Sequence, residues 1–182
     1  MKIRLVSLKR SSEDTEKIRQ LYESAFPENE RAPFAVLLRG MKKKNVNFFS
    51  CHADGEWAGL LYVVNRKELS YIFYFAVDEA KRGRGIGTAV LKAAQKKYSG
   101  RTFFLAAEEV DESFFNYSER VRRQHFYEHA GFVRTGQKMQ EGNVIFDLMS
   151  AGGAVADRDY RRLMRSFMGL RLLFIPMKIL DP

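Results

Sequence analysis

The residues with the clearest chemical potential lie in one basic segment, Lys81-Arg82-Gly83-Arg84-Gly85-Ile86-Gly87-Thr88. A strand-like run that ends in Phe75-Ala76-Val77 precedes it, and a pattern typical of a helix follows. Backbone N–H groups at the start of a helix carry partial positive charge and bind anions. Glycines let a phosphate approach the backbone, while the basic side chains and the threonine hydroxyl add charge and a donor. The segment therefore predicts a diphosphate-binding site.

Two other kinds of phosphate-binding loop fit this segment less well. A dinucleotide-binding loop requires glycine or alanine where Thr88 or Val90 stands, depending on which glycine begins the count. A P-loop ends in Gly-Lys followed by Ser or Thr, and the sequence has no such triplet. The remaining alternative is a tight basic turn that binds no ligand. Three glycines at a helix start, interleaved with basic residues, favour the phosphate site.

The elements that position this segment follow from the periodicity of the apolar residues. Alternation predicts strands near residues 3–5, 47–51, 57–64, 69–77 and 102–107, and a closing hairpin of 132–136 and 143–149. Helical spacing predicts helices that begin after Ser12, at Pro33, near residue 86 and at Glu119, and another near residues 157–168. The second of these helices would run to the basic end at residues 41–44, and the apolar residues 170–180 would form a final strand or packed tail. This order predicts a mixed α/β domain rather than a regular alternation of strands and helices.

Length and composition limit the class of protein. The chain has 182 residues, 46% of them hydrophobic, which suffices for one globular domain with a sizeable core. Cys51 is the only cysteine, which excludes an internal disulfide and argues against a cysteine-based metal site. The sequence contains neither a run of roughly 18 apolar residues nor the pattern of a secretory signal. We therefore expect a cytoplasmic protein.

The net charge of +9 favours an anionic partner, although solubility is an equally simple explanation. Four arginines, Arg158, Arg161, Arg162 and Arg165, lie opposite the apolar stripe of a predicted helix near the C-terminus. Such a helix binds a membrane surface or a nucleic acid or, more commonly, docks through its apolar side. The sequence lacks the interleaved aromatic and basic residues of a nucleic-acid binder. We expect no specific nucleic acid and no membrane as a partner.

Two landmarks resemble the GNAT family of N-acetyltransferases. The family's acetyl-CoA motif is Arg or Gln, two residues, Gly, one residue, then Gly or Ala, and residues 82–87 match it at every fixed position. Phe126-Tyr127-Glu128-His129-Ala130-Gly131-Phe132 resembles the second landmark, an aromatic-Tyr helix end before Gly-Phe. The resemblance covers roughly residues 2–150. Residues 25–34 and 122–127, with Asn116, further resemble a little-characterised bacterial branch of the family.

The resemblance implies a GNAT-like mixed α/β fold, in which a mostly antiparallel, twisted central sheet is flanked by helices. It also implies acetyl-CoA as co-substrate, with residues 82–88 on the diphosphate and the backbone of residues 75–77 on the pantetheine arm. Asn116 and Arg123 are further candidates for coenzyme A binding. We expect residues 1–150 to form this acyl-CoA-binding domain. Residues 151–182 would be a C-terminal helix and strand extension, packed on the same domain or on the partner subunit of a homodimer.

An amine must lose a proton before it attacks a thioester, and the departing thiolate then gains one. No covalent enzyme intermediate is required, so Cys51 needs no catalytic role. The resemblance places Tyr127 as the acid, with aromatic packing at a helix end as the alternative. Many family members carry a glutamate base about where this chain has Tyr71, which leaves Glu108, Glu109 or a chain of waters. Adjacent strand residues point to opposite faces, so at most one of these carboxylates enters the cleft.

Several features leave the function open. The family usually shapes its acceptor site in the connection that here contains Glu28, Glu30 and Arg31, and a solvated loop is the alternative. His125 and His129 share a helix face but lack the glutamate of a His-Glu-x-x-His motif, so we expect no metal. The acceptor, a small amine, a peptide N-terminus or a protein lysine, is not identified by the sequence. The rival function is a non-catalytic acyl-CoA sensor, because the strand glutamate is missing.

Overall fold

The computed structural model describes residues 1–28, 31–169 and 176–180. The chain divides into two compact units. The first consists of Met1–Val64 and Ile72–Lys97, and the second of Asn65–Tyr71 and Tyr98–Pro182. The predicted division after residue 150 stays a prediction.

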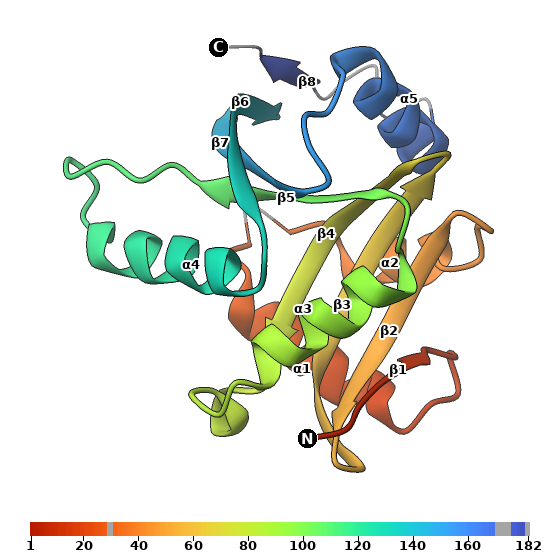
Figure 1. Cartoon of the computed structure of the whole chain (residues 1–182). Coiled ribbons are helices and arrows are strands. Elements are labelled where there is room, and N and C mark those ends of the chain that lie inside the picture. The colour runs from red at the N-terminus through yellow and green to blue at the C-terminus, as the bar shows by residue number, and fades with distance from the viewer. Residues whose placement is uncertain (29–30, 170–175, 181–182) are drawn as a thin grey trace. The chain divides into compact units, whose positions relative to one another are not determined.

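The first unit is built on antiparallel strands. Its strands follow one another in the order β1 (Ile3–Ser7), β2 (Val46–Ala53), β3 (Glu56–Arg66) and β4 (Leu69–Val77), except that the adjoining ends of β3 and β4, residues 65–66 and 69–71, belong to the second unit. β1 pairs with β2, and β2 pairs with β3, in both cases antiparallel. The helices of this unit are α1 (Asp14–Ala25), α2 (Phe34–Gly40) and α3 (Ile86–Lys97), with a 3-10 turn, η1 (Glu79–Lys81), before α3. Figure 1 shows α1 behind these strands and α3 in front of them.

Alternation along β2 explains why helices cover both of its faces. The Ser50 hydroxyl donates to the carboxylate of Asp14 at the start of α1 over 2.6 Å, and His52 Nε2 lies 3.0 Å from the same carboxylate oxygen. Phe49, the residue before Ser50, points the other way, and the centre of its ring lies 5.6 Å from Lys97 Nζ at the end of α3. Each face of the strand is therefore fixed to a different helix, as period-two alternation requires.

The second unit contains the remaining strands and helices. In sequence they are β5 (Thr102–Glu108), α4 (Tyr117–His129), β6 (Val133–Glu141), β7 (Val144–Ala151), α5 (Asp157–Met168) and β8 (Met177–Leu180). The strands lie side by side in the order β5-β7-β6-β8, and every neighbouring pair is antiparallel. The β6–β7 pairing shifts register between Arg134 and Lys138. β6 ends at Glu141 rather than near residue 136, where the sequence predicts its end.

α5 packs through its apolar side within the second unit. Its buried residues are Tyr160, Leu163, Met164 and Phe167, whereas the four arginines of the helix are exposed. The Gln137 side-chain amide holds the segment before the helix, because it donates to Val155 O and accepts from Val155 N. β8 pairs with the free edge of β6. Residues 170–175, which the sequence assigns to a final strand or tail, lie outside the described residues.

The expected fold class, mixed α/β with mostly antiparallel strands flanked by helices, is confirmed. Residues 42–44, predicted as the end of the second helix, follow Gly40, the last residue of α2. Among the residues that the structure describes, no helix has both the length and the apolar character needed to cross a membrane.

Gly59 of β3 lies where no side chain fits. A Cβ at this position would stand 2.2 Å from Ala76 O and 3.0 Å from Val77 Cα, both at the end of β4. Both neighbours are backbone atoms of a strand and cannot turn aside as a flexible side chain would. The absence of a side chain at Gly59 therefore fixes how closely β3 approaches the end of β4.

We predict that Gly59→Ala destabilises the protein by about 1–3 kcal/mol or more, because the added methyl group forces β4 to move. Gly55→Ala is the matched control. Gly55 is in the same hairpin with φ +92°, and its Cβ would meet nothing within 4 Å, so this change costs only the left-handed backbone, about 1 kcal/mol. Urea unfolding followed by circular dichroism measures both. A loss at Gly59 no larger than at Gly55 would contradict the steric argument.

Candidate active site

The basic segment forms an open bend between β4 and α3. The bend begins at Asp78, whose N–H donates to Ala58 O and whose carboxylate accepts from Ala80 N over 3.3 Å. Gly83 and Gly85 have φ angles of +75° and +72°, in the left-handed region that favours glycine. A Cβ at either glycine would have nothing within 4 Å, and residues 82–85 are exposed. The bend is therefore accessible to a ligand, as a phosphate site requires.

The start of α3 offers donors for an anion. The first helical hydrogen bond that spans four residues runs from Ala89 N to Gly85 O, so the N–H groups of Ile86, Gly87 and Thr88 precede it. The first turn of the helix contains no acidic residue that could occupy these donors or neutralise the helix dipole. Among the described residues these three N–H groups donate to no backbone carbonyl, so this end of α3 combines available donors with a positive potential.

The basic side chains of the bend have different environments. Lys81 forms an ion pair with Glu56, which lowers the pKa of that carboxyl group. The Arg82 Nε donates to Val77 O over 3.1 Å and so ties the bend to the end of β4. Among the described residues, no carboxylate forms an ion pair with Arg82 or Arg84. These two guanidinium groups therefore remain available for an anion.

The residues predicted to contact the pantetheine arm lie at the end of β4. Ala76 is buried, and Phe75 and Val77 are partly exposed. Gly59 allows the close packing of this strand end, and Arg82 occupies its last carbonyl oxygen. The structure thus brings residues 75–77 and 82–88 together within the first unit. Their contacts with acetyl-CoA stay a prediction.

A second group of predicted site residues meets at the end of β5. The Glu108 carboxylate forms ion pairs with Arg120, at 3.5 Å, and with Arg123. The Asn116 amide nitrogen is 3.5 Å from Glu108 Oε1, and its amide oxygen accepts from Arg120 Nε over 2.7 Å. The Arg120 guanidinium also lies 3.8 Å from the centre of the Phe114 ring. Glu108 at the end of β5, Asn116 just before α4 and Arg123 on α4 therefore belong to one charged cluster.

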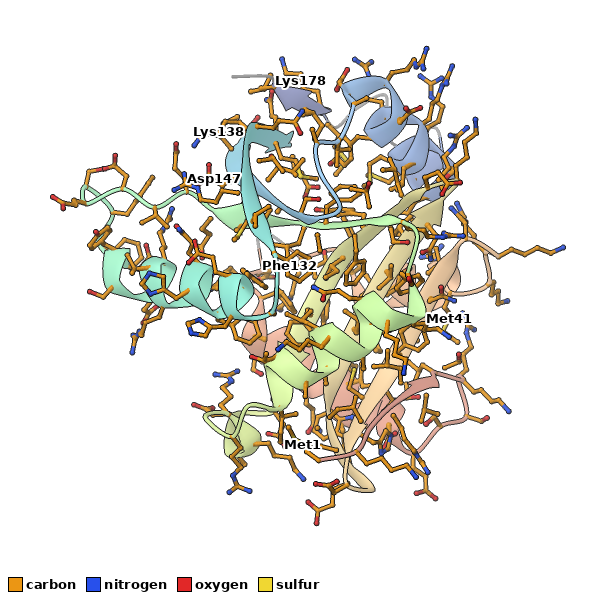
Figure 2. The ribbon with its side chains drawn as sticks, in the orientation of Figure 1. Met1, Met41, Phe132, Lys138, Asp147 and Lys178 are labelled. Atoms are coloured by element: carbon orange, nitrogen blue, oxygen red, sulfur yellow. The ribbon has the colours of Figure 1, made fainter. Side chains whose placement is uncertain are left out.

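Glu109 makes separate interactions. Its carboxylate accepts from Lys138 Nζ over 2.7 Å, and Lys138 also donates to Asp147 over 2.6 Å. Figure 2 shows Lys138 and Asp147 together on the neighbouring strands β6 and β7. Burial acts against the charge of Lys138, but its bonds to Asp147 and Glu109 raise the lysine pKa overall. Both carboxylates proposed as bases are thus engaged by cations.

Tyr127 lies one helical turn after Arg123 on α4. Its ring packs 5.2 Å from Phe126 and 6.2 Å from Phe132, between ring centres. Burial raises the pKa of the Tyr127 phenol, although Arg123 opposes the shift. The phenol therefore keeps its proton at neutral pH, which a proton donor must do. Its predicted contact with the thiolate is not tested by this geometry.

Sequence reasoning missed Glu141, the partner of Tyr71. The Tyr71 hydroxyl donates to Glu141 Oε1 over 2.6 Å, although 70 residues separate the two in the chain. A glutamate before Gly-Asn in a predicted hairpin looks like an ordinary turn charge. Only the three-dimensional contact distinguishes it.

The connection between α1 and α2 is fixed by hydrogen bonds. Arg31 donates to Glu23 O and Phe26 O, and the Tyr22 hydroxyl donates to Ala32 O. Arg31 therefore supports the backbone of its own connection. Glu28 is exposed, and Glu30 lies outside the described residues.

The three histidines have protein partners rather than a shared site. His52 lies in the cluster with Asp14 and Ser50, and His129 Nδ1 contacts His125 O. Across the described residues, no three His, Cys, Asp or Glu side chains gather as metal ligands would.

We predict that Glu108→Gln lowers the unfolding free energy by about 1–3 kcal/mol, because the part-buried Arg120 loses its charged partner. Glu112→Gln in the exposed loop between β5 and α4 is the control and should change stability by less than about 0.5 kcal/mol. Urea unfolding at neutral pH compares the two. If Glu108→Gln is as stable as Glu112→Gln, the ion pairs of Glu108 do not contribute measurably to the stability of the fold.

Solved structures share this fold at low sequence identity. A GNAT-family acetyltransferase from Bacteroides thetaiotaomicron has a TM-score of 0.69 and 19% identity, and the match covers 94% of this chain and 98% of that one. An aminoglycoside 6'-N-acetyltransferase complexed with coenzyme A has a TM-score of 0.62 and 16% identity, with 83% and 96% covered. The ribosomal-protein-S18-alanine N-acetyltransferase from Escherichia coli has a TM-score of 0.62 and 15% identity, with 85% and 96% covered.

Sequence comparison identifies the family. No curated protein sequence matches the chain. The sequence model of the acetyltransferase (GNAT) domain matches residues 44–134, which include the bend, both carboxylates at the end of β5 and the whole of α4. The resemblance drawn from the two motifs is thereby confirmed, and the chain belongs to the GNAT family of acetyltransferases.

Proposed function

We propose that this protein transfers an acetyl group from acetyl-CoA to a primary amine. One observation carries the proposal: the bend before α3 is exposed, contains two left-handed glycines with free space before them, and holds Arg82 and Arg84, which form no ion pair with a carboxylate of the described residues. A diphosphate fits such a bend in size, charge and hydrogen-bonding capacity. Family membership supports the same ligand.

Each candidate residue has a defined role in this proposal. The N–H groups of residues 86–88 and the side chains of Arg82 and Arg84 bind the diphosphate, and the backbone of residues 75–77 binds the pantetheine arm. Acetyl-CoA supplies an activated thioester. Asn116 and Arg123 are proposed as further contacts for coenzyme A. The Arg123 side chain is 47% exposed, although it pairs with Glu108.

The proton transfers define the remaining roles. The acceptor must lose a proton before its nitrogen can attack, and Tyr127 is proposed to protonate the sulfur that leaves. No residue needs to form a covalent bond to the acetyl group, because the amine attacks directly. Cys51 is fully buried, and burial raises the pKa of its thiol far above the usual range, in keeping with a structural role.

Glu108, Glu109 and a chain of waters all remain candidates for the base. Both carboxylates are paired with cations, which occupy oxygens that would otherwise accept the proton of the amine. This pairing favours the water chain, or requires that the acceptor displace Arg123 or Lys138.

The acceptor is proposed as an amine from the chemistry of similar proteins. The coenzyme A complex described above is named for an aminoglycoside, and the Escherichia coli structure for an alanine of ribosomal protein S18. Both names place the transferred acetyl group on a nitrogen. The two acceptors share no scaffold, so only the amine itself carries over to this chain.

The same ion pairs favour a second function, a non-catalytic acyl-CoA sensor. A sensor needs the bend but neither a base nor an acid. Turnover distinguishes the two functions, since both predict binding of coenzyme A.

We predict that Gly85→Ala weakens coenzyme A binding at least about 10-fold, because the new methyl group stands where the diphosphate approaches the backbone. Gly100→Ala is the matched control: Gly100 also has a left-handed φ, +83°, and open space, but follows the end of α3. Isothermal titration with coenzyme A measures both variants. If wild type itself fails to bind, or both variants bind like wild type, the diphosphate site is wrong.

We predict that Tyr127→Phe lowers kcat about 100-fold or more while the KM for acetyl-CoA changes little, because a proton donor acts after binding. The control is Tyr117→Phe, at the first residue of the same helix. Thiol release from acetyl-CoA in the presence of an amine panel gives both constants. Binding of coenzyme A without turnover of any amine would support the sensor, and unchanged kcat would remove Tyr127 from the mechanism.

A further inference from the structure

Glu141 has an arrangement that the proposed transfer does not use. It is the last residue of β6, beside the turn to β7. Its Oε1 accepts two hydrogen bonds, from the Tyr71 hydroxyl over 2.6 Å and from the Tyr160 hydroxyl over 2.7 Å. Two phenols from different elements therefore hold one oxygen of this carboxylate in a fixed direction.

The other oxygen is unoccupied by the described part of the chain. Oε2 accepts no hydrogen bond there and is not among the buried polar atoms that lack a partner. Glu141 itself is half-buried rather than enclosed. Oε2 therefore keeps its hydrogen-bonding capacity while Oε1 is held.

Within the described residues, Glu141 forms no ion pair, although the chain has a net charge of +9. The nearest basic residue along β8 is Lys178, which Figure 2 labels. Lys178 lies opposite Gln140, and Met177 lies opposite Glu141. Because neighbouring strand residues point to opposite faces, Lys178 projects away from the face of Glu141. The strand register thus keeps this cation from the carboxylate.

The surroundings make the charge costly. The rings of Tyr71, Phe104 and Tyr160 pack against one another, with Tyr71 and Phe104 stacked at 5.0 Å, and all three are buried. Burial raises the pKa of Glu141, and the two phenol hydrogen bonds only partly oppose the shift. Because the pKa of Glu141 is higher in the folded than in the unfolded protein, its contribution to the free energy of unfolding falls as the pH rises from the unfolded-state pKa through the folded-state pKa. A glutamine would make the same two bonds without the charge, so stability alone does not explain a glutamate here.

We propose that Glu141 binds the ammonium group of an amine ligand, with Tyr71 and Tyr160 as positioning residues. An ammonium ion supplies both the positive charge and the N–H donor that Oε2 lacks, and the apolar rings beside it strengthen the pairing. A metal ion is a poor alternative, because no group of three His, Cys, Asp or Glu side chains that could hold one is found among the described residues. If the bound amine is the acceptor of the acetyl group, the inference rests on the proposed function. Binding of alkylammonium ions at Glu141 does not depend on that function.

The test uses 1,4-diaminobutane as the cationic probe and butanamide as its neutral counterpart, titrated into the full chain without acetyl-CoA. Wild type should bind the diamine and not the amide, and Glu141→Gln should bind the diamine at least about 10-fold more weakly. The affinity should also fall as the pH is lowered through the raised pKa of Glu141. The variant should be no less stable than wild type in urea unfolding, which excludes misfolding as the cause.

Glu119→Gln, an exposed change on α4, is the control and should bind the diamine like wild type. Equal affinity of wild type and Glu141→Gln, or no diamine binding by wild type up to about 50 mM, a concentration at which even millimolar affinity is visible, would overturn the proposal.

Turnover separates an acceptor from an effector. If Glu141→Gln raises the KM of the transferred amine about 10-fold and leaves the KM of acetyl-CoA unchanged, the bound ammonium is the acceptor. If diamine binding depends on Glu141 but the amine KM does not, the acceptor assignment is overturned and the ammonium is an effector. If wild type neither binds coenzyme A nor turns over, the proposed function fails while the diamine titration still decides the role of Glu141.

Discussion

Three backbone N–H groups at the start of α3 can receive an anion only while no part of the protein fills the space before them. The chain meets this constraint because certain side chains and charges are missing around these N–H groups. Gly83 and Gly85 have no side chain, and the first turn of α3 has no carboxylate. Arg82 ties the bend to the last carbonyl oxygen of β4. Gly59 contributes from a distance, because the end of β4 can lie as it does only against a residue without a side chain.

This first unit could largely be predicted from the sequence. Glycine, basic residues and the change from strand to helix periodicity are local signals, and the bend depends on local structure. The helix limits were less accurate where tertiary structure decides them, as at the lysines after Gly40. The hydrogen bond from Arg82 to the end of β4 is also local, but it could not be predicted, because the sequence does not show in which direction the Arg82 side chain points.

The second unit was harder to predict, because its chemistry depends on pairs of distant residues. Arg120 and Arg123 share a helix face, which the sequence shows, but their common partner Glu108 does not follow from spacing. Glu109 was expected to differ from Glu108 in direction, and the two carboxylates do reach different cations. Glu141 was missed altogether, since its two phenol partners lie 70 and 19 residues away. Glu108 and Glu109 are thus paired with basic side chains, whereas Glu141 forms no ion pair within the described residues.

β8 has a consequence for how copies of this protein can meet. The outer edge of β6 would otherwise offer a row of unpaired amide and carbonyl groups, the usual route by which one sheet continues into another molecule. β8 covers the β6 segment from Lys138 to Glu141. A second copy that extended the sheet on this side would have to join a strand of four residues carrying an exposed lysine, or displace it. Short, charged outer strands resist such growth, so self-association through this edge is disfavoured and a homodimer would have to use another surface.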